Sequence, residues 1–167
     1  MFAFVPLLLL AATPIQLGEV KFDRYPAFAE LKGVECDELL RKEVLATLIK
    51  AMEPKAVEVR ELDGAFVRRL DIRLRNLKQE NRSRADLLND PNGGGSRTEV
   101  TVDITFDGTA SKGLKGWAKG PYFGTTRRRD LEGTPDAEEL AVQLVNRQRA
   151  RAVGQAIANA LVPVLAP

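Results

Sequence analysis

Residues 99–107 read Glu-Val-Thr-Val-Asp-Ile-Thr-Phe-Asp, with polar and apolar side chains alternating without interruption. Successive side chains of a β-strand point to opposite faces of a sheet, so this pattern predicts a strand with one face in the core and one in water. The apolar face of such a sheet must be covered by another layer of structure. The chain is therefore restricted to layered folds in which one side of a sheet is covered.

Further alternating runs predict more strands. In residues 66–75, Leu70, Ile72 and Leu74 share one face and charged residues take the other. The Asp63-Gly64 pair before this run is a common hairpin turn, which predicts antiparallel pairing with the preceding short strand. Besides 66–75 and 99–107, strands are expected at residues 57–60 and at the glycine-bearing residues 111–123, and an additional early strand is suggested for residues 18–25.

Two segments show helical periodicity. Within residues 37–52, Leu40, Val44, Leu48 and Met52 recur at four-residue spacing, which predicts an amphipathic helix. A second, longer helix is expected from Pro135, with Thr134 as its N-cap, to residue 161, where Pro163 would end it.

The predicted elements give an α+β fold, an antiparallel sheet of about four strands with two helices packed on one face. The length of 167 residues suits one domain, which we place at residues 19–167. Residues 81–98 include Asp90-Pro91-Asn92 and three consecutive glycines, and this composition predicts a flexible loop.

The first twelve residues have no charged side chain, and Thr13-Pro14 ends the run. Its length fits the apolar region of a secretory signal better than a membrane-spanning helix. We expect residues 1–18 to be a signal peptide, cleaved after Ala12 or near Gly18, and the protein to be periplasmic or otherwise in the cell envelope. The alternative is an apolar first strand or a buried terminal helix of a cytosolic protein.

The chain has no histidine and one cysteine, Cys36. This composition excludes catalytic triads that use histidine, imidazole metal ligands and an intramolecular disulfide. Cys36 lies near a helix start, so it is either a reactive thiol or a buried one. We expect no cofactor, no metal and no enzymatic activity.

The net charge of +2 is small, but the basic residues are clustered. Guanidinium groups bind phosphate in a bidentate manner, so an arginine-rich strand face could meet an anionic partner. Trp117 lies among glycines and lysines, where its ring could stack on a base or sugar. The alternatives are a solvated face of mixed charge and a twisted edge strand protected by its lysines, with Trp117 closing the core. The candidate binding residues are Arg69, Arg73, Arg75, Trp117, Arg127, Arg128 and Arg129.

The order of elements over residues 19–165 resembles the lipopolysaccharide-assembly lipoprotein family of Gram-negative envelope accessory proteins. The likeness lies in the apolar leader, the strand at 99–107 and the closing helix at 135–161. It implies a non-catalytic protein that plugs an outer-membrane barrel and binds lipopolysaccharide. Members of the family carry a lipidated cysteine after the signal, whereas Thr13 follows the apolar run here.

Three functions follow from these observations. The first is a peripheral, non-catalytic envelope accessory protein that binds a protein partner or an anionic component such as lipopolysaccharide. The second is a cytosolic nucleic-acid-binding module that uses the same arginines and Trp117, with affinity that falls steeply as salt rises. The third is a histidine-free hydrolase, which would require Asp71 and Asp103 to converge in a pocket.

Overall fold

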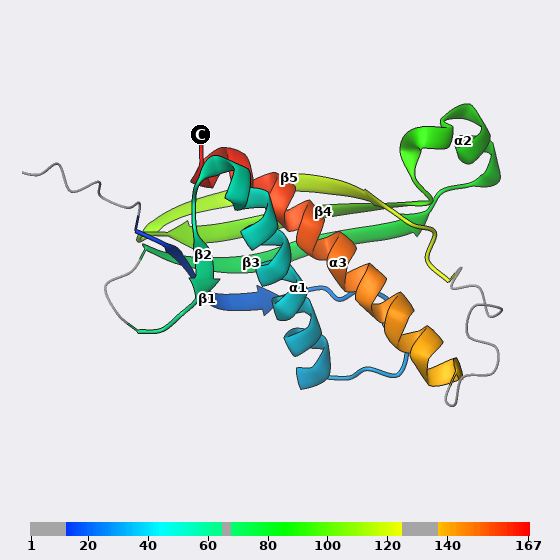
Figure 1. The fold of residues 1–167 in the computed structure, drawn as a ribbon, viewed down its shortest axis with the longest axis horizontal. Coiled ribbons are helices and arrows are strands. Elements are labelled where there is room, and N and C mark those ends of the chain that lie inside the picture. Colours follow the sequence, from blue (N-terminus) through cyan, green and yellow to red (C-terminus); the bar gives the residue numbers. More distant parts are fainter. Residues whose placement is uncertain (1–12, 65–67, 125–136) are drawn as a thin grey trace, which may run out of the picture.

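The computed structural model describes residues 13–64, 68–124 and 137–167. Helices α1 and α3 lie side by side on one face of a single sheet (Figure 1). The elements along the chain are β1 (Ile15–Phe22), α1 (Val34–Met52), η1 (Glu53–Lys55), β2 (Val59–Glu61), β3 (Arg68–Asn81), α2 (Arg84–Asn89), η2 (Pro91–Gly93), β4 (Ser96–Phe106), β5 (Thr109–Gly120) and α3 (Ala137–Leu165).

The sheet has five strands in the order β2-β1-β3-β4-β5. The α+β class is as predicted, but the sheet is mixed instead of antiparallel: β1 runs parallel to both β2 and β3, while β3, β4 and β5 form an antiparallel meander. The early strand suggested for residues 18–25 is β1, which starts at Ile15 and lies inside the sheet. It pairs parallel to β2 because α1 carries the chain back between the two strands.

The hairpin predicted at Asp63-Gly64 is wrong. Ile15 of β1 pairs with Val59 at the start of β2 and with Arg68 at the start of β3. The chain after β2 therefore returns across β1 before β3 begins, and β1 separates the two strands that the turn was expected to join. Residues 65–67 lie outside the described residues.

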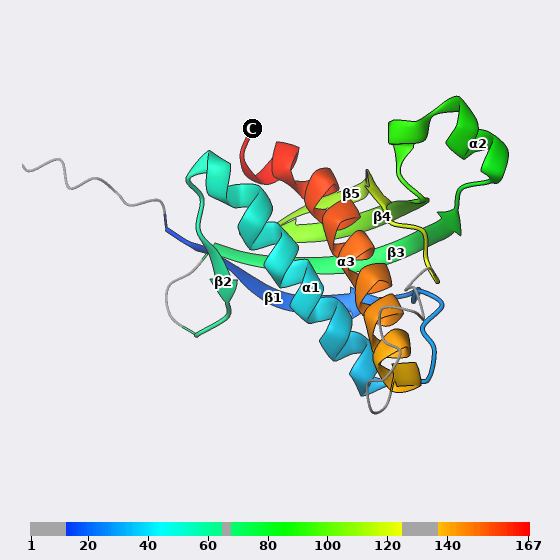
Figure 2. The ribbon, with the colours of Figure 1, turned by 45° about the vertical axis from the view of Figure 1, so that its right-hand side comes forward.

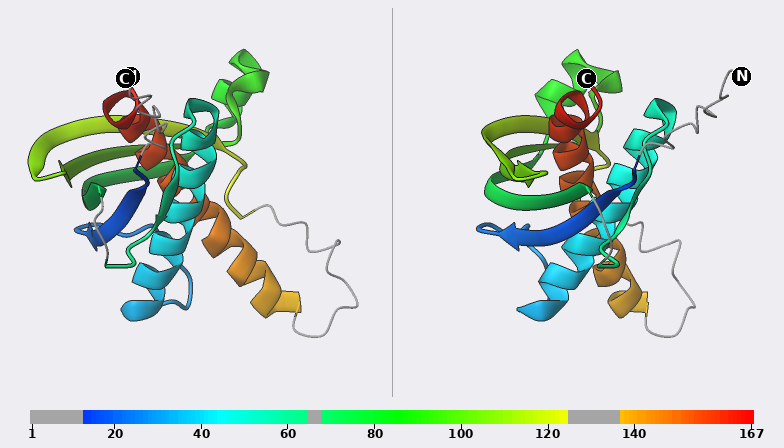
Figure 3. Two further views of the ribbon diagram at one scale, coloured as in Figure 1. Left: turned by 60° about the vertical axis from the view of Figure 1, so that its left-hand side comes forward. Right: turned by 90° about the vertical axis from the view of Figure 1, so that its left-hand side faces the viewer.

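The core lies between the sheet and the two long helices. Leu40, Val44, Leu48 and Met52 of α1 are all fully buried, which confirms the predicted helical face. They belong to one cluster with the inward side chains of the sheet and α3, including Leu70, Ile72, Leu74, Val100, Val102, Ile104, Val153, Ile157 and Leu161. The opposite face of the sheet has no helix packed against it in the described part of the chain (Figures 2 and 3).

Helix α3 runs past its predicted end. Pro163 lies inside the helix, near its C-terminus. Proline is costly in a helix interior because it lacks an N–H, but a single missing bond in the last turns does not stop the helix, and the N–H of Ala166 still bonds to the carbonyl of Val162. Thr134 and Pro135, the predicted start, lie outside the described residues.

The predicted flexible loop at residues 81–98 contains regular structure. Ser83 and Asp86 form a capping box that starts α2, since each side chain bonds to the backbone N–H of the other residue. The Arg82 guanidinium donates to the carbonyl oxygens of Asp86, Asp90 and Gly94. These bonds hold together a segment whose composition suggested disorder.

The predicted signal peptide lies only partly within the described residues. Residues 1–12 are outside them, and the predicted boundary at residue 18 falls inside β1. Ile15 and Leu17 are fully buried, so cleavage near Gly18 would remove core side chains, whereas cleavage after Ala12 would leave β1 whole. In the segments that the structure describes, no helix has the length and apolar character needed to cross a bilayer.

Candidate binding surface on the open face of the sheet

The side chains that point away from α1 and α3 form the open face of the sheet, on strands β3, β4 and β5. Arg69, Arg73 and Arg75 all extend from β3 on this face, as the alternation predicted. Arg127, Arg128 and Arg129 lie outside the described residues, so their position relative to this face is not described.

The three β3 arginines are paired with carboxylates. Arg69 Nε lies 2.9 Å from Asp71 Oδ1, and Arg73 Nε lies 3.0 Å from Asp23 Oδ2. Arg75 lies 3.6 Å from Asp23 and 3.8 Å from Asp103. Their charge is thus largely balanced within the protein, in agreement with the alternative of a solvated, mixed-charge face.

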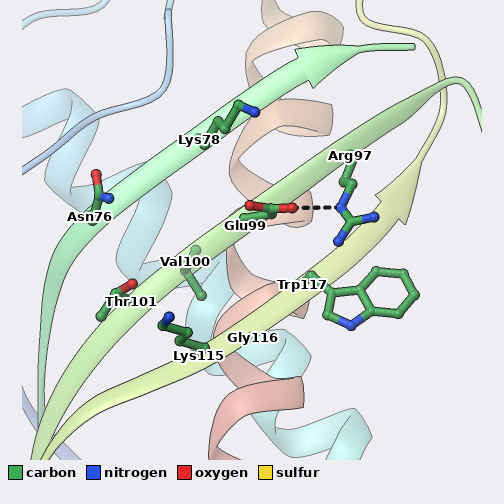
Figure 4. Close-up of a pocket in the computed structure, with 9 residues that line it drawn as sticks. All are labelled: Asn76, Lys78, Arg97, Glu99, Val100, Thr101, Lys115, Gly116 and Trp117. Atoms are coloured by element: carbon green, nitrogen blue, oxygen red, sulfur yellow. Dashed lines mark ion pairs between the residues drawn. The ribbon is translucent and has the colours of Figure 1, made fainter.

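A groove of about 400 Å³ lies further along the same face, across the three antiparallel strands (Figure 4). We call it the Trp117 groove. Basic and aromatic side chains dominate its polar lining, which consists of Asn76 and Lys78 from β3, Arg97, Glu99 and Thr101 from β4, and Lys115 and Trp117 from β5. Of these residues, the sequence analysis identified only Trp117 as a binding residue.

Trp117 does not close the core, because 48 % of its side chain is exposed. Its neighbour Gly116 explains this: a Cβ at Gly116 would lie 2.0 Å from the Ala156 carbonyl oxygen of α3, so Gly116 faces the helix and Trp117 faces away from it. The Arg97 guanidinium lies 5.1 Å from the centre of the indole ring and the Lys119 ammonium 5.8 Å from it. Both distances are in the range of cation–π attraction.

The cations around the Trp117 groove differ in how they are paired. Arg97 lies 2.7 Å from Glu99, and Lys78 lies 3.2 Å from Glu80. Lys115 forms no ion pair with any residue in the described ranges, and neither do Lys112 and Lys119 on the same strand. The uncompensated positive charge of the open face is therefore on β5, and not on β3 as the arginine pattern suggested.

The carboxylates of the hydrolase alternative, Asp71 and Asp103, both line a shallow hollow of about 170 Å³. Asp71 Oδ1 accepts bonds from the Glu19 backbone N–H at 2.6 Å and from Arg69 Nε at 2.9 Å. Asp103 Oδ1 accepts the Gly113 backbone N–H at 2.8 Å. Each carboxylate thus binds a backbone N–H of a neighbouring strand, which is a structural contact between strands.

Cys36 is buried near the start of α1. Burial raises the pKa of its thiol, and the nearby carboxylates of Asp37 and Glu35 raise it further. A raised pKa lowers the thiolate fraction at neutral pH, so the buried alternative is favoured over the reactive one. Among the residues that the structure describes, no cluster of three or more metal-ligating side chains occurs.

Alternation along the sequence could have placed Arg97 and Lys115 on the open face, because Arg97 lies two residues from Glu99 and Lys115 lies two residues from Trp117. The pattern does not say which residues of β3, β4 and β5 lie opposite one another, and the groove depends on that register. Glu99 of β4 lies opposite Trp117 of β5 on one side and opposite Lys78 of β3 on the other. These two pairings bring the groove residues together.

Comparisons with known proteins give little further information. No protein-family model matches the chain, and no curated protein sequence matches it. Among solved structures, the chain is similar to a minor lipoprotein from Acinetobacter baumannii, with 12% sequence identity over 93% of this chain and 94% of that chain and a TM-score of 0.36. This is a loose likeness.

Proposed function

We propose that the chain is a non-catalytic accessory domain of the cell envelope whose Trp117 groove binds an anionic envelope component, such as the phosphorylated sugars of lipopolysaccharide. The observation that carries this proposal is that Lys115, without an acidic partner among the described residues, lines the same groove as the exposed ring of Trp117. The envelope location rests on the apolar run at residues 1–12, and the absence of catalysis is part of the proposal.

The chemistry of the groove suits a phosphate attached to a ring. Lysine and arginine form charge-assisted hydrogen bonds to phosphate oxygens, and arginine can do so with two parallel bonds. The Arg97–Glu99 pair is half exposed on both sides, and exposed pairs contribute only about 0–1 kcal/mol. Arg97 can therefore exchange Glu99 for a phosphate at little cost, while Lys115 has no such partner to release.

Trp117 is the only tryptophan of the chain, so its fluorescence reports on the groove directly. We expect lipopolysaccharide dispersions to shift the Trp117 emission, and vesicles of phosphatidylcholine to leave it unchanged. The double variant Arg97→Gln/Lys115→Gln removes two groove charges and should weaken binding at least about tenfold, because each charged contact contributes roughly 1 kcal/mol or more.

The matched control is Lys42→Gln/Lys50→Gln, which removes the same charge from exposed positions on α1. It should bind like the wild type. Equal weakening by both double variants would mean that net charge, and not the groove, determines binding. The triple variant Arg69→Gln/Arg73→Gln/Arg75→Gln should have a smaller effect than the groove variant, because those arginines are paired internally.

The nucleic-acid alternative uses the same ring and cations, since bases stack on exposed aromatic side chains beside basic groups. Titration of a single-stranded oligonucleotide against the same fluorescence signal distinguishes the two. Tight oligonucleotide binding that weakens steeply with salt, together with no response to lipopolysaccharide, would replace the envelope proposal with the nucleic-acid one.

A further inference from the structure

We propose that the outer edge of β5 binds an extended segment of a partner protein, which adds to the sheet as a further strand and carries alternating acidic and small apolar side chains. This inference goes beyond the proposed function: its occupant is a polypeptide, and the contact is made by the backbone at the strand edge instead of by side chains in the Trp117 groove.

The edge is formed by one side of the β5 backbone. Among the strands that the structure describes, β5 is the last of the sheet and pairs only with β4. The carbonyl of Trp117 accepts a hydrogen bond from Asn159 Nδ2 of α3 at 2.8 Å, so it points away from β4. In an antiparallel strand, alternate residues direct both backbone groups to the same side, which places those of Lys115 and Lys119 on the outer edge as well. No side chain from the described ranges bonds to the backbone groups of Lys115 or Lys119.

The other edge of the sheet is much less suited to strand addition. It is β2, which has only three residues, whereas β5 has twelve. A short edge strand offers few backbone groups to an incoming segment, which is a common protection against unwanted pairing. The long exposed edge of this sheet is therefore β5.

A groove of about 760 Å³ lies beside this edge, between β5 and the flank of α3. On the α3 side its wall is formed by Gln155, Asn159, Val162 and Pro163, with Ala51 from the end of α1. An added strand would lie in this groove next to β5. Its inward side chains would meet Ala51, Val162 and Pro163, which favours small apolar residues there.

The outward side chains of the added strand would lie on the open face, beside Lys115 and Lys119. Opposite charges on neighbouring strands stabilise pairing, and like charges destabilise it. The added strand would therefore bind best with acidic residues at alternate positions. A second copy of β5 would bring lysines against lysines, which disfavours self-pairing and indicates a different protein as the occupant.

The experiment uses the full chain and a peptide of about eight residues that alternates valine and glutamate, which is a usual strand length. We expect the peptide to quench or shift Trp117 fluorescence and to slow amide hydrogen exchange at Lys115, Trp117 and Lys119. A peptide that alternates valine and lysine should bind at least about tenfold more weakly, because two or more lysine contacts become repulsive.

Two variants at Lys119 separate backbone pairing from charge. Lys119→Gln removes the charge and keeps the N–H, so it should weaken peptide binding by no more than about fivefold, as for one exposed charge. Lys119→Pro also removes the outward N–H and fills its place, and it should abolish binding, because main-chain hydrogen bonds give strand addition its affinity. Circular dichroism establishes that both variants are folded.

Three results would overturn the proposal. The first is equal peptide binding by Lys119→Pro and Lys119→Gln. The second is an unchanged rate of hydrogen exchange at the amides of Lys115, Trp117 and Lys119 when the wild type binds the peptide. The third is self-association of the chain that rises with concentration and that the peptide does not inhibit. The amide measurement needs no variant, so it decides the question even if Lys119→Pro does not fold. Lipopolysaccharide binding is measured separately, and its failure leaves the peptide results unaffected.

Discussion

Gln16 and Asp63 form a two-way hydrogen-bonded contact where the chain after β2 crosses β1. Gln16 Nε2 donates to Asp63 Oδ1 at 2.8 Å, and Gln16 Oε1 accepts the Asp63 backbone N–H at 2.9 Å. Gln16 points to the open face between two core residues of β1, yet only 1 % of it is exposed. Gln16 thus satisfies both the backbone N–H and the carboxylate of Asp63, and this contact holds the chain that leaves β2 against β1.

Substitution of Gln16 by leucine should destabilise the protein by about 1–3 kcal/mol, because two part-buried hydrogen bonds to Asp63 are lost. Urea denaturation followed by circular dichroism measures this change. The control is Gln143→Leu on the exposed face of α3, which should change the free energy of unfolding by less than about 0.5 kcal/mol. A stable Gln16→Leu protein would show that the crossing is held by other contacts.

Asn146 makes a second contact of this kind, between α3 and the segment that precedes α1. Its Nδ2 donates to the Ala29 carbonyl at 2.7 Å and its Oδ1 accepts the Ala29 N–H at 3.0 Å. Because Asn146 is buried, Asn146→Ala should cost about 1–3 kcal/mol. Asn159→Ala, which removes one exposed bond to Trp117, should cost less than Asn146→Ala in the same denaturation experiment. The reverse order would contradict this assignment.

Gly116 of β5 packs closely against α3. An alanine there would place its Cβ against the Ala156 carbonyl and the Ala160 side chain, so β5 and α3 would have to separate. We expect Gly116→Ala to destabilise the protein by about 1–3 kcal/mol through overpacking. Ala110→Val, which adds volume at an exposed position of the same strand, should be nearly neutral. Thermal unfolding of the two variants makes the comparison.

Tyr25 links stability to alkaline pH. Its hydroxyl donates to Asp37 Oδ1 at 2.6 Å, and this bond, together with burial and the negative charge of Asp37, raises the pKa of Tyr25 from 10.0 to about 12. The folded state holds the proton more tightly than the unfolded state, so the contribution to stability is complete below pH 10 and is lost as the pH rises toward 12. In the variant Tyr25→Phe, the decrease of stability over this range should be smaller than in the wild type.

The titration of Tyr25 can also be observed directly. The difference in ultraviolet absorbance between wild type and Tyr25→Phe isolates this phenol from Tyr122, the other tyrosine of the chain. We expect its midpoint near pH 12 in the wild type and closer to pH 10 in Asp37→Asn, which lacks the carboxylate. An unchanged midpoint in Asp37→Asn would exclude the hydrogen bond as the cause.

Much of the secondary structure was predictable because burial imposes a period on the sequence. The two-residue period predicted β4 and the inward face of β3, and the four-residue period predicted the buried face of α1. Composition was a poorer guide where hydrogen bonds decide the structure. The glycines and proline of residues 81–98 suggest a loop, yet Arg84–Asn89 form α2, which Ser83 and Asp86 cap.

The candidate site was predictable only in part. Alternation placed Arg69, Arg73 and Arg75 on the open face, but it gave no information on their carboxylate partners, of which Asp23 lies 50 residues from Arg73 in the chain. The exposure of Trp117 depends on the contact of Gly116 with α3, a residue pair from distant parts of the sequence. Both facts arise from the packing of separate elements, which local patterns do not encode.

The periodicity of the sequence is enough to identify the apolar faces of the main strands and helices, and therefore a sheet covered on one side by helices. The neighbours of each strand, with β1 between β2 and β3 and β5 at the edge of the sheet, follow only from the way distant elements pack. The physical reason is that strand pairing uses backbone N–H and carbonyl groups, which are alike in nearly every residue. The choice among pairings is made by specific distant contacts, such as Gln16 with Asp63 and Gly116 with Ala156.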